Sequence, residues 1–358
     1  MSLRLCFLVL LSLLAAACAP AREAVPLVVA GSTVLPAASA TAPAGPTDTP
    51  TPADATPQVV PTGVPTAVTA TPAAAITAPA PGATATGLAA QPFAHIFVIV
   101  FENRSIESTL ANPYFKQLAA RGAFLSNYHG VGHPSQPNYL AMLAGATLVG
   151  DDGDHTLPQT NLVDRLEAAG LSWKAYEETY PGSCFAGSWS GDPIGGLYAR
   201  KHNPFISFDN IRTNPRRCAQ IVNASALAAD IAANRLPAFS FYTPNQNNDG
   251  HDRPLDVAAR WLQGFIEPKL ADPNFATGTL VVIVFDESDV TTAGPADNHV
   301  YGLLLGPKVH AGSSDGARYT HYSILRTVED NFGLATLNRG DATELPFGLC
   351  NFTAGCSP

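Results

Sequence analysis

Basic residues are scarce in this chain of 358 residues. Its 20 lysines and arginines are outnumbered by 29 aspartates and glutamates, which leaves a formal net charge of −9. No segment gathers enough positive charge to form the stripe that neutralises nucleic-acid phosphates. The composition therefore excludes nucleic acid as the expected partner.

Long hydrophobic runs are also missing. The most apolar run, residues 5–14, is too short to span a bilayer comfortably as a helix. Arg4 precedes this run and three alanines lead from it into Cys18, an arrangement typical of a signal peptide. It resembles the lipobox of bacterial lipoproteins, although Ala15 stands where leucine is preferred. We predict that residues 1–18 are a lipoprotein signal peptide with lipidation at Cys18.

An ordinary secretory signal is the alternative for this segment. Both interpretations predict a protein outside the cytoplasm, and the first adds a lipid anchor as its only membrane contact. Residues 19–92 contain no aromatic residue and are dominated by alanine, proline and threonine. Such a composition cannot bury enough apolar surface to form a core. We expect a disordered tether, spanning roughly 50 Å if it behaves as a flexible coil.

None of the cysteines has the spacing of metal ligands. After Cys6 and Cys18 are assigned to the N-terminal segment, four cysteines remain, an even number that suits disulfides in an oxidising compartment. Three pairings are possible. We favour Cys184 with Cys218, and Cys350 with Cys356, because the second pair closes a short loop near the C-terminus.

The remaining segment, 93–358, suits one α/β domain. Strand-like and helix-like segments alternate along it, which predicts a mostly parallel central sheet with helices on both faces. The apolar, β-branched runs at 95–101 and 279–285 are its clearest strands. Further strands are expected at 172–176, 238–242 and 300–305, and helices at 113–121, 138–143, 162–169, 225–234, 255–270 and 322–332.

Polar residues follow both of the clearest strands. Glu102 and Asn103 follow the first, and Asp286 and Glu287 follow the second. Each pair taken alone is typical of a solvated loop. Together they would meet at the carboxyl edge of the sheet, where ligands bind in such folds. Carboxylates that converge there repel one another unless a cation intervenes, so the pattern indicates a divalent metal ion.

Ser135 stands between Pro134 and Pro137, just before a predicted helix. A serine at a helix N-terminus suits a developing alkoxide or a bound phosphate because the backbone N–H groups and the dipole favour negative charge. The alternative is a simple N-cap residue. A serine triad on a nucleophile elbow is disfavoured, because the chain has no G-x-S-x-G sequence.

Other candidates lie in loops. Asp249 and His251 follow the strand predicted at 238–242, and a carboxylate with an imidazole is a common metal or phosphate-handling pair. Lys201 and His202 offer a cation and an imidazole for phosphate oxygens. Weaker candidates are His299, and His133, which is two residues from Ser135.

Six segments in this order resemble the phosphoesterase family of acid phosphatases and phosphatidylcholine-type phospholipases C, within the alkaline-phosphatase-like superfamily. They are FEN (101–103), GHPSQPNY (132–139), ARKHNPF (199–205), PNQNNDGHD (244–252), FDES (285–288) and THYSILRTVED (320–330). The resemblance covers the globular part and none of the tether. It implies that Ser135 is the nucleophile and that four side chains hold the metal: Glu102, Asn103, Asp286 and Glu287.

The resemblance also assigns the neighbouring half of the site. Asp249, with Lys201, His202 and His299 as further candidates, would bind a second ion or the phosphate. We expect His251 to protonate the leaving group. The sequence does not distinguish Mg, Ca, Mn and Zn, nor one ion from two. The C-terminal domains of the phospholipases are absent, which favours a phosphomonoesterase that acts on small phosphoesters through a phosphoserine.

Three alternatives remain. A phospholipase C-type diesterase would use the same residues. A non-catalytic cell-surface binding lipoprotein would need the tether and the fold but none of these side chains together. A glycosidase would explain the acidic strand ends, but it would not require Ser135 or the Asp249-Gly250-His251 loop.

Overall fold

The computed structural model describes residues 93–190, 196–289, 298–348 and 351–352. A central eight-stranded sheet has the order β12-β2-β11-β9-β1-β8-β4-β7. In chain order its strands are β1 (His95–Phe101), β2 (Ala123–Leu125), β4 (Trp173–Glu177), β7 (Ile221–Asn223), β8 (Phe239–Thr243), β9 (Thr279–Phe285), β11 (Gly302–Leu305) and β12 (Ser313–Asp315).

The predicted mostly parallel sheet is confirmed. β1 pairs in parallel with β8 and β9, and β4 pairs in parallel with β8 and β7. β2 also runs parallel to β12, whereas β11 is antiparallel to both β9 and β2. The side chains of β1 and β9 are almost all fully buried, which is why both strands read as continuous apolar runs.

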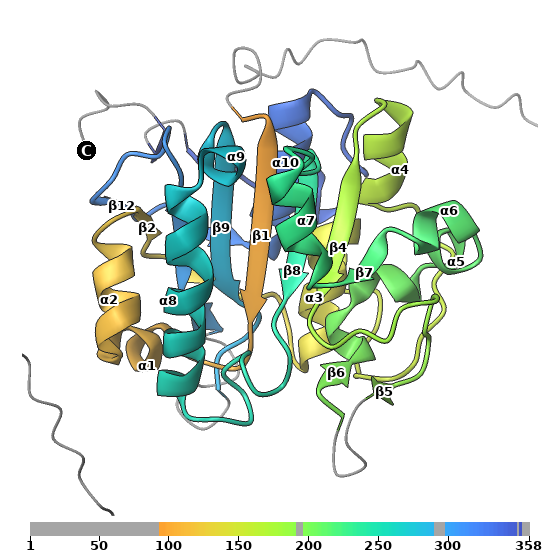
Figure 1. Cartoon of the computed structure of the whole chain (residues 1–358), viewed down its shortest axis with the longest axis horizontal. Helices are drawn as coiled ribbons and strands as arrows, with labels where there is room; N and C mark the ends of the chain where they lie inside the picture. Colours follow the sequence, from red (N-terminus) through yellow and green to blue (C-terminus); the bar gives the residue numbers. More distant parts are fainter. Residues whose placement is uncertain (1–92, 191–195, 290–297, 349–350, 353–358) are drawn as a thin grey trace, which may run out of the picture. The chain divides into compact units, whose positions relative to one another are not determined.

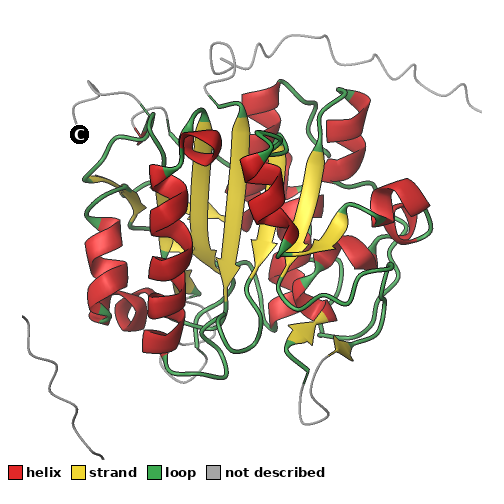
Figure 2. Ribbon diagram, viewed as in Figure 1, coloured by secondary structure: helices red, strands yellow, loops and turns green. Residues whose placement is uncertain are grey.

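Helices cover both faces of this sheet, as predicted. Figure 1 shows α8 and α7 crossing in front of the strands, with α3 and α10 beyond them, and Figure 2 shows the same layers by type of structure. The α-helices are α1 (Ile106–Ala111), α2 (Pro113–Ala119), α3 (Ser135–Ala144), α4 (Leu162–Ala168), α5 (Asp209–Arg212), α6 (Pro215–Cys218), α7 (Ala226–Ala232), α8 (Leu255–Ala271), α9 (Pro273–Ala276), α10 (His321–Phe332) and α11 (Gly340–Thr343), with 3-10 turns η1 (Arg200–His202) and η2 (Pro204–Ser207).

The pairing register of β1 and β9 fixes the positions of the residues that directly follow the two strands. Their partners run without a break from His95 opposite Thr279 to Phe101 opposite Phe285. The two strands therefore end at the same level of the sheet, at the end marked by the arrowhead of β1 in Figure 1. The polar residues that follow them must emerge side by side.

Most predicted elements occur within one or two residues of their expected bounds, with two informative differences. The helix expected at 138–143 is α3, which begins at Ser135 and ends at Gly145. Gly145 has a φ of 65°, the left-handed conformation that glycine adopts readily at a helix end. The strand expected at 300–305 is divided into β10 (His299–Val300) and β11, and β10 joins β3 (Tyr128–His129) and β13 (Tyr319–Thr320) in a small second sheet.

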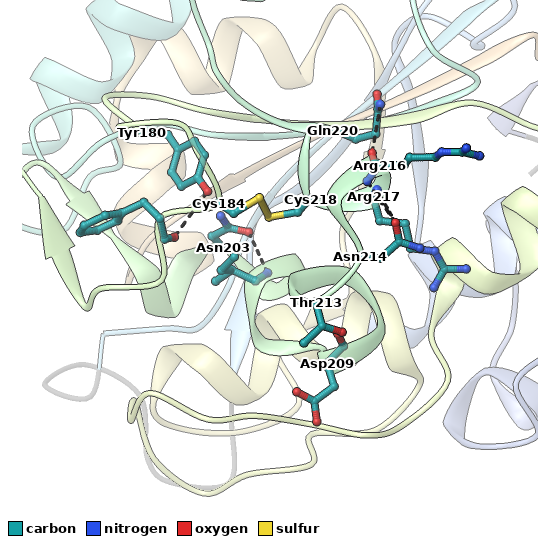
Figure 3. The surroundings of a disulfide bond; sticks show 12 residues. Tyr180, Cys184, Asn203, Asp209, Thr213, Asn214, Arg216, Arg217, Cys218 and Gln220 are labelled. Carbon is teal, nitrogen blue, oxygen red and sulfur yellow. Dashed lines mark hydrogen bonds between the residues drawn. A yellow bond between two sulfur atoms is a disulfide. The ribbon is translucent and has the colours of Figure 1, made fainter.

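One of the two predicted disulfides is confirmed. Cys184 and Cys218 are bonded, which ties the segment after β4 to the end of α6. Figure 3 shows Asn203, which follows Lys201 and His202 in the chain, in the surroundings of this bond. The same segment is preceded by β6 (Tyr198–Ala199), which pairs with β5 (Trp189–Ser190) in a two-stranded sheet. The other predicted pair, Cys350 with Cys356, lies outside the described residues, as do the signal peptide with Cys18 and the tether.

Within the described part of the chain, no helix is both long and apolar enough to cross a membrane.

A buried acidic residue on α10 makes the fold sensitive to pH. Glu329 is fully buried, and neither of its carboxylate oxygens has a hydrogen-bond partner among the described residues. Burial, and then the negative charge of Asp341, raise the pKa of Glu329 to about 8. In an unfolded chain the pKa of glutamate is about 4.3. Between these values the folded state keeps a proton that the unfolded state releases, so stability falls as the pH rises.

Glu329→Gln should therefore stabilise the domain at alkaline pH. Glutamine has the shape of the protonated glutamate but cannot ionise, so the penalty that develops between about pH 4.3 and pH 8 disappears. We expect the variant to melt several degrees higher than the parent at pH 8 and at the same temperature near pH 4.3. Thermal unfolding followed by circular dichroism across this range tests it, and a variant less stable than the parent at pH 8 would contradict it.

Candidate active site

The carboxyl ends of three neighbouring strands meet at one point of the sheet. The backbone N–H of Asp286 donates to the carbonyl oxygen of Phe101 at 2.9 Å, which extends the β1–β9 pairing by one residue. On the other side, the N–H of Glu102 donates to the carbonyl oxygen of Asp249 at 2.9 Å. Residues from the loops after β1, β8 and β9 are thus joined by their backbones before their side chains are considered.

Ser135 points into this cluster. It is the first residue of α3, its side chain is buried, and its hydroxyl donates to Glu102 at 3.0 Å and to Glu287 at 3.3 Å. The helix cap position belongs to Pro134, and no side chain caps the helix. The structure therefore shows that Ser135 is not the N-cap residue of α3. Its hydroxyl contacts the carboxylates instead of the helix backbone.

His202 is the partner of Glu102 inside the protein. Its Nε2 lies 2.8 Å from Oε1 of Glu102, and its ring stacks on Tyr139 with the centroids 5.1 Å apart. Both Glu102 and His202 are almost completely buried. Burial alone would raise the pKa of Glu102, but the charge and hydrogen bond of His202, aided by the charge of Lys201, lower it to about 2. Glu102 is therefore ionised at any physiological pH.

The pKa values of the neighbouring carboxyl groups shift in the opposite direction, upwards. Burial, followed by the negative charge of Glu102, raises the pKa of Asp249 and of Asp286 well above the usual range. The same two causes raise the pKa of Glu287 to about 8. Burial and the negative charge of Glu102 thus both disfavour the ionised form of these three neighbouring carboxyl groups.

The donor chemistry of these residues fits a divalent cation. Asp249 and Asp286 each have one buried carboxylate oxygen without a hydrogen-bond partner among the described residues. The amide of Asn103 lies beside them and donates to Glu102 at 3.1 Å. Oxygen donors of this kind suit hard divalent ions, whose charge would offset the repulsion. Among the described residues, no three or more His, Cys, Asp or Glu side chains are arranged so that they could hold a metal ion together, so the fit concerns donor type and burial.

A cavity of about 480 Å³ opens onto this cluster. Its volume is enough for a small phosphoester. Its walls come from the residues after β1, β8 and β9, from the start of α3, from the loop between α3 and α4, and from η1. Its lining residues are Asn103, Arg104, His133, Pro134, Ser135, Asp152, Lys201, His251, Glu287 and Asp289.

The structure brings most of the sequence-predicted residues to this cavity. Asn103, Ser135, Glu287, Lys201 and His251 line it, and Glu102, Asp286 and Asp249 are completely buried. The ammonium of Lys201 lies 3.5 Å from the hydroxyl of Ser135. The half-exposed ring of His251 contacts Asp252 at 2.6 Å.

Two predicted histidines lie elsewhere. His202 is not part of the cavity lining; it lies on the far side of Glu102, where it contacts Gln246 at 3.1 Å. Nε2 of His299, on β10, forms a hydrogen bond with the carbonyl oxygen of Ser126, and the ring stacks on that of His129. The structure does not bring His299 together with the other candidates.

The sequence patterns do not point to Arg104, Asp152 and Asp289, which also line the cavity. They indicate His133 only as a weaker candidate, although its Nδ1 lies 2.5 Å from Oε2 of Glu287. Arg104 directly follows the predicted pair after β1. Asp152 belongs to an acidic stretch, residues 151–154, that follows no strand, so the rule of looking at strand ends does not reach it.

Comparison with known protein families shows which family the chain belongs to. Residues 108–335 match the sequence profile of the Phosphoesterase family, which is well over half of the chain. The chain belongs to this family. The matched part of this phosphoesterase includes Ser135, Lys201, Asp249 and Glu287, whereas Glu102 and Asn103 precede it.

Curated relatives of this phosphoesterase carry phosphatase names. A probable acid phosphatase from Kluyveromyces lactis is 38% identical over 263 residues, covering 71% of this chain and 62% of the relative. An acid phosphatase from Aspergillus fumigatus is 34% identical over 257 residues, covering 70% of this chain and 57% of the relative. The chain thus spans less than two thirds of these fungal proteins. A phosphatidylinositol-3-phosphatase from Mycobacterium tuberculosis is 33% identical over 275 residues, covering 73% of this chain and 84% of the relative.

A solved structure supports the fold. A protein of the alkaline phosphatase superfamily from Vibrio parahaemolyticus matches with a TM-score of 0.50 and 14% identity, covering 71% of this chain and 70% of that one. This confirms the alkaline-phosphatase-like fold predicted for this phosphoesterase.

Removing the imidazole of His202 should destabilise the protein through Glu102. In His202→Ala the buried carboxylate loses its nearest partner, and breaking one side of a buried pair costs about 3–5 kcal/mol. We expect the free energy of unfolding, measured by urea denaturation, to fall by about that amount. His251→Ala is the matched control: its exposed contact with Asp252 should contribute less than about 1 kcal/mol. Equal losses in the two variants would contradict this role for His202.

Proposed function

We propose that this protein is an exported, metal-dependent phosphoester hydrolase of the acid phosphatase type, with Ser135 as nucleophile. One observation carries the proposal: the hydroxyl of Ser135 donates to two buried carboxylates at a cavity that Lys201 also lines. The acid phosphatase and phosphatidylinositol phosphatase relatives support a phosphomonoester as substrate.

The nucleophile acts from a rigid position. All residues of α3 are buried, so the helix holds Ser135 in place. In the first step the hydroxyl oxygen of Ser135 attacks phosphorus and the bond to the leaving alkoxide breaks. The hydroxyl proton leaves along one of its hydrogen bonds to Glu102 or Glu287. Water then hydrolyses the phosphoserine and releases inorganic phosphate.

Positive groups around Ser135 suit the phosphate. Lys201 lies 3.5 Å from the nucleophilic oxygen, close enough to contact a phosphoryl oxygen bound to it. Burial lowers the pKa of Lys201, but the negative charges of Glu102 and Asp152 and the hydrogen bond to Asp152 outweigh it and raise the pKa, so the ammonium stays charged. His251 lines the same cavity. In this proposal it protonates the leaving alkoxide, a contribution of about 10²–10⁴-fold in rate.

A divalent ion completes the proposed site. Glu102, Asn103, Asp286 and Glu287 would hold it, and Asp249 would serve a second ion or help to bind the phosphate. When bound, the ion would supply Lewis-acid stabilisation of the transferring phosphoryl group and lower the pKa of the attacking hydroxyl.

A phosphodiesterase is the second candidate. A non-hemolytic phospholipase C from Burkholderia pseudomallei is 25% identical over 207 residues, covering 49% of this chain and 29% of the relative. That relative shares only part of its length with this chain. The proposal therefore favours a monoester over a diester, and the rates on nitrophenyl phosphate and nitrophenyl phosphocholine measure the preference.

Ser135→Ala should lower kcat on nitrophenyl phosphate by about 10³-fold or more, because removal of a nucleophile leaves only binding and electrostatic stabilisation. Steady-state kinetics with the divalent ion present measure the loss. Ser240→Ala is a matched control, since Ser240 is a buried serine on β8 whose hydroxyl has no partner among the described residues. Activity of Ser135→Ala within a few-fold of the parent would disprove the nucleophile assignment.

Exhaustive chelation should abolish most of the activity and also lower the melting temperature. A ligand that binds only the folded state at 100 times its Kd stabilises that state by about 2.7 kcal/mol. Differential scanning fluorimetry, with Mg, Ca, Mn or Zn added back singly, identifies the ion that restores both properties. Asp286→Asn should lose the thermal response. Unchanged activity and melting after chelation would show that no exchangeable ion takes part.

A further inference from the structure

Asp152 connects two groups that flank the nucleophile. Its Oδ1 accepts a hydrogen bond from the backbone N–H of Gln136 at 2.9 Å. Its Oδ2 accepts one from the ammonium of Lys201 at 3.0 Å. Gln136 is the second residue of α3, directly after Ser135, and the Lys201 ammonium is 3.5 Å from the hydroxyl of Ser135. One carboxylate thus bridges the backbone N–H of the residue after the nucleophile and the ammonium that contacts the nucleophilic oxygen.

These two donors are the kind that a phosphoryl group uses. The N-terminal N–H groups of a helix and a lysine ammonium both bind anionic oxygens. A phosphoryl group attached to the hydroxyl oxygen of Ser135 would carry its free oxygens into the immediate surroundings of that atom. It would therefore meet the same two donors, each of which is already bonded to Asp152.

The side chain of Asp152 is exposed enough for a ligand to displace it. Its side chain is about a third exposed, at 31%, and it lines the cavity from the loop between α3 and α4. The side chain of Asp152 is thus accessible to solvent, whereas Glu102 and Asp286 are completely buried. An exposed carboxylate that moves into solvent regains its hydration, so the exchange for a phosphate oxygen costs less than it would for a buried acid.

We propose that Asp152 is a specificity residue of the phosphate site, a place-holding anion that the phosphate of the substrate displaces from Lys201 and the Gln136 N–H. By competing for these donors it weakens the binding of any phosphate and speeds the release of inorganic phosphate, the product. A dianionic monoester competes better for the ammonium than a singly charged diester, so the residue also favours monoesters. This inference rests on the proposed function.

The test compares phosphate binding in the presence and absence of the competing carboxylate. Isothermal titration calorimetry with inorganic phosphate is carried out on Ser135→Ala and on the same variant carrying Asp152→Ala or Asp152→Asn, with the same divalent ion throughout. We expect the Kd to fall by about tenfold, equivalent to about 1.4 kcal/mol, when the carboxylate is removed. Asp152→Asn keeps an acceptor for the Gln136 N–H, so it covers the case in which the alanine variant fails to fold.

A matched control separates this local competition from the general loss of a negative charge. Asp151→Ala removes an acid from the same loop, but Asp151 contacts His155 and the N–H of Gly153 instead of the nucleophile helix. It should leave the phosphate Kd unchanged. In the enzyme with Ser135 intact, Asp152→Asn should lower the KM for nitrophenyl phosphate without raising kcat, because inorganic phosphate also leaves more slowly.

The opposite result is equally clear. If Asp152 only holds Lys201 in place, both Asp152 variants bind phosphate more weakly, and KM rises while kcat falls. Weaker, equal or undetectable phosphate binding in the Asp152 variants would overturn the inference. Failure of the proposed function looks different: the enzyme with Ser135 intact would show no phosphatase activity, while calorimetry would still report on Asp152.

Discussion

The parallel pairing of β1 with β9 determines the geometry of the whole site. Because Phe101 lies opposite Phe285, the strands end together and deliver Glu102 and Asp286 to the same place. A slip of one residue would move every side chain of a strand to the other face of the sheet. The side chains of β1 and β9 are packed in the core on both faces, and their close fit opposes such a slip. The core therefore indirectly fixes the relative positions of the acidic residues.

The site then has to hold several acids close together inside the protein. Glu102 is the residue on which this balance depends: His202 keeps it ionised, and its charge raises the pKa of the carboxyl groups around it. Such an arrangement costs folding free energy unless a cation compensates it. The same positioned charges are what phosphoryl transfer requires, because catalysis there relies mainly on electrostatic stabilisation. Stability and function therefore make opposite demands on these residues.

Sequence patterns identified the strands and the residues at their ends well, because burial on both faces produces uninterrupted apolar runs. They also identified Ser135, although its hydroxyl could not be distinguished from a helix cap without the structure. The roles of His202 and Asp152 could not be predicted from the sequence. The sequence predicts His202 as a ligand of phosphate or of a second ion, but in the structure it contacts Glu102 outside the cavity. Asp152 contacts the N-terminus of α3 from a loop that does not follow a strand.

The sequence by itself determined the sheet class, the family resemblance and the set of acidic and basic residues available for chemistry. These follow from local periodicity and from motifs, which are properties of neighbours along the chain. The tertiary structure alone decided which of these residues meet. Contacts such as Ser135 with Glu287 join positions about 150 residues apart, and their distances depend on strand register, helix placement and loop packing, which only the folded core specifies.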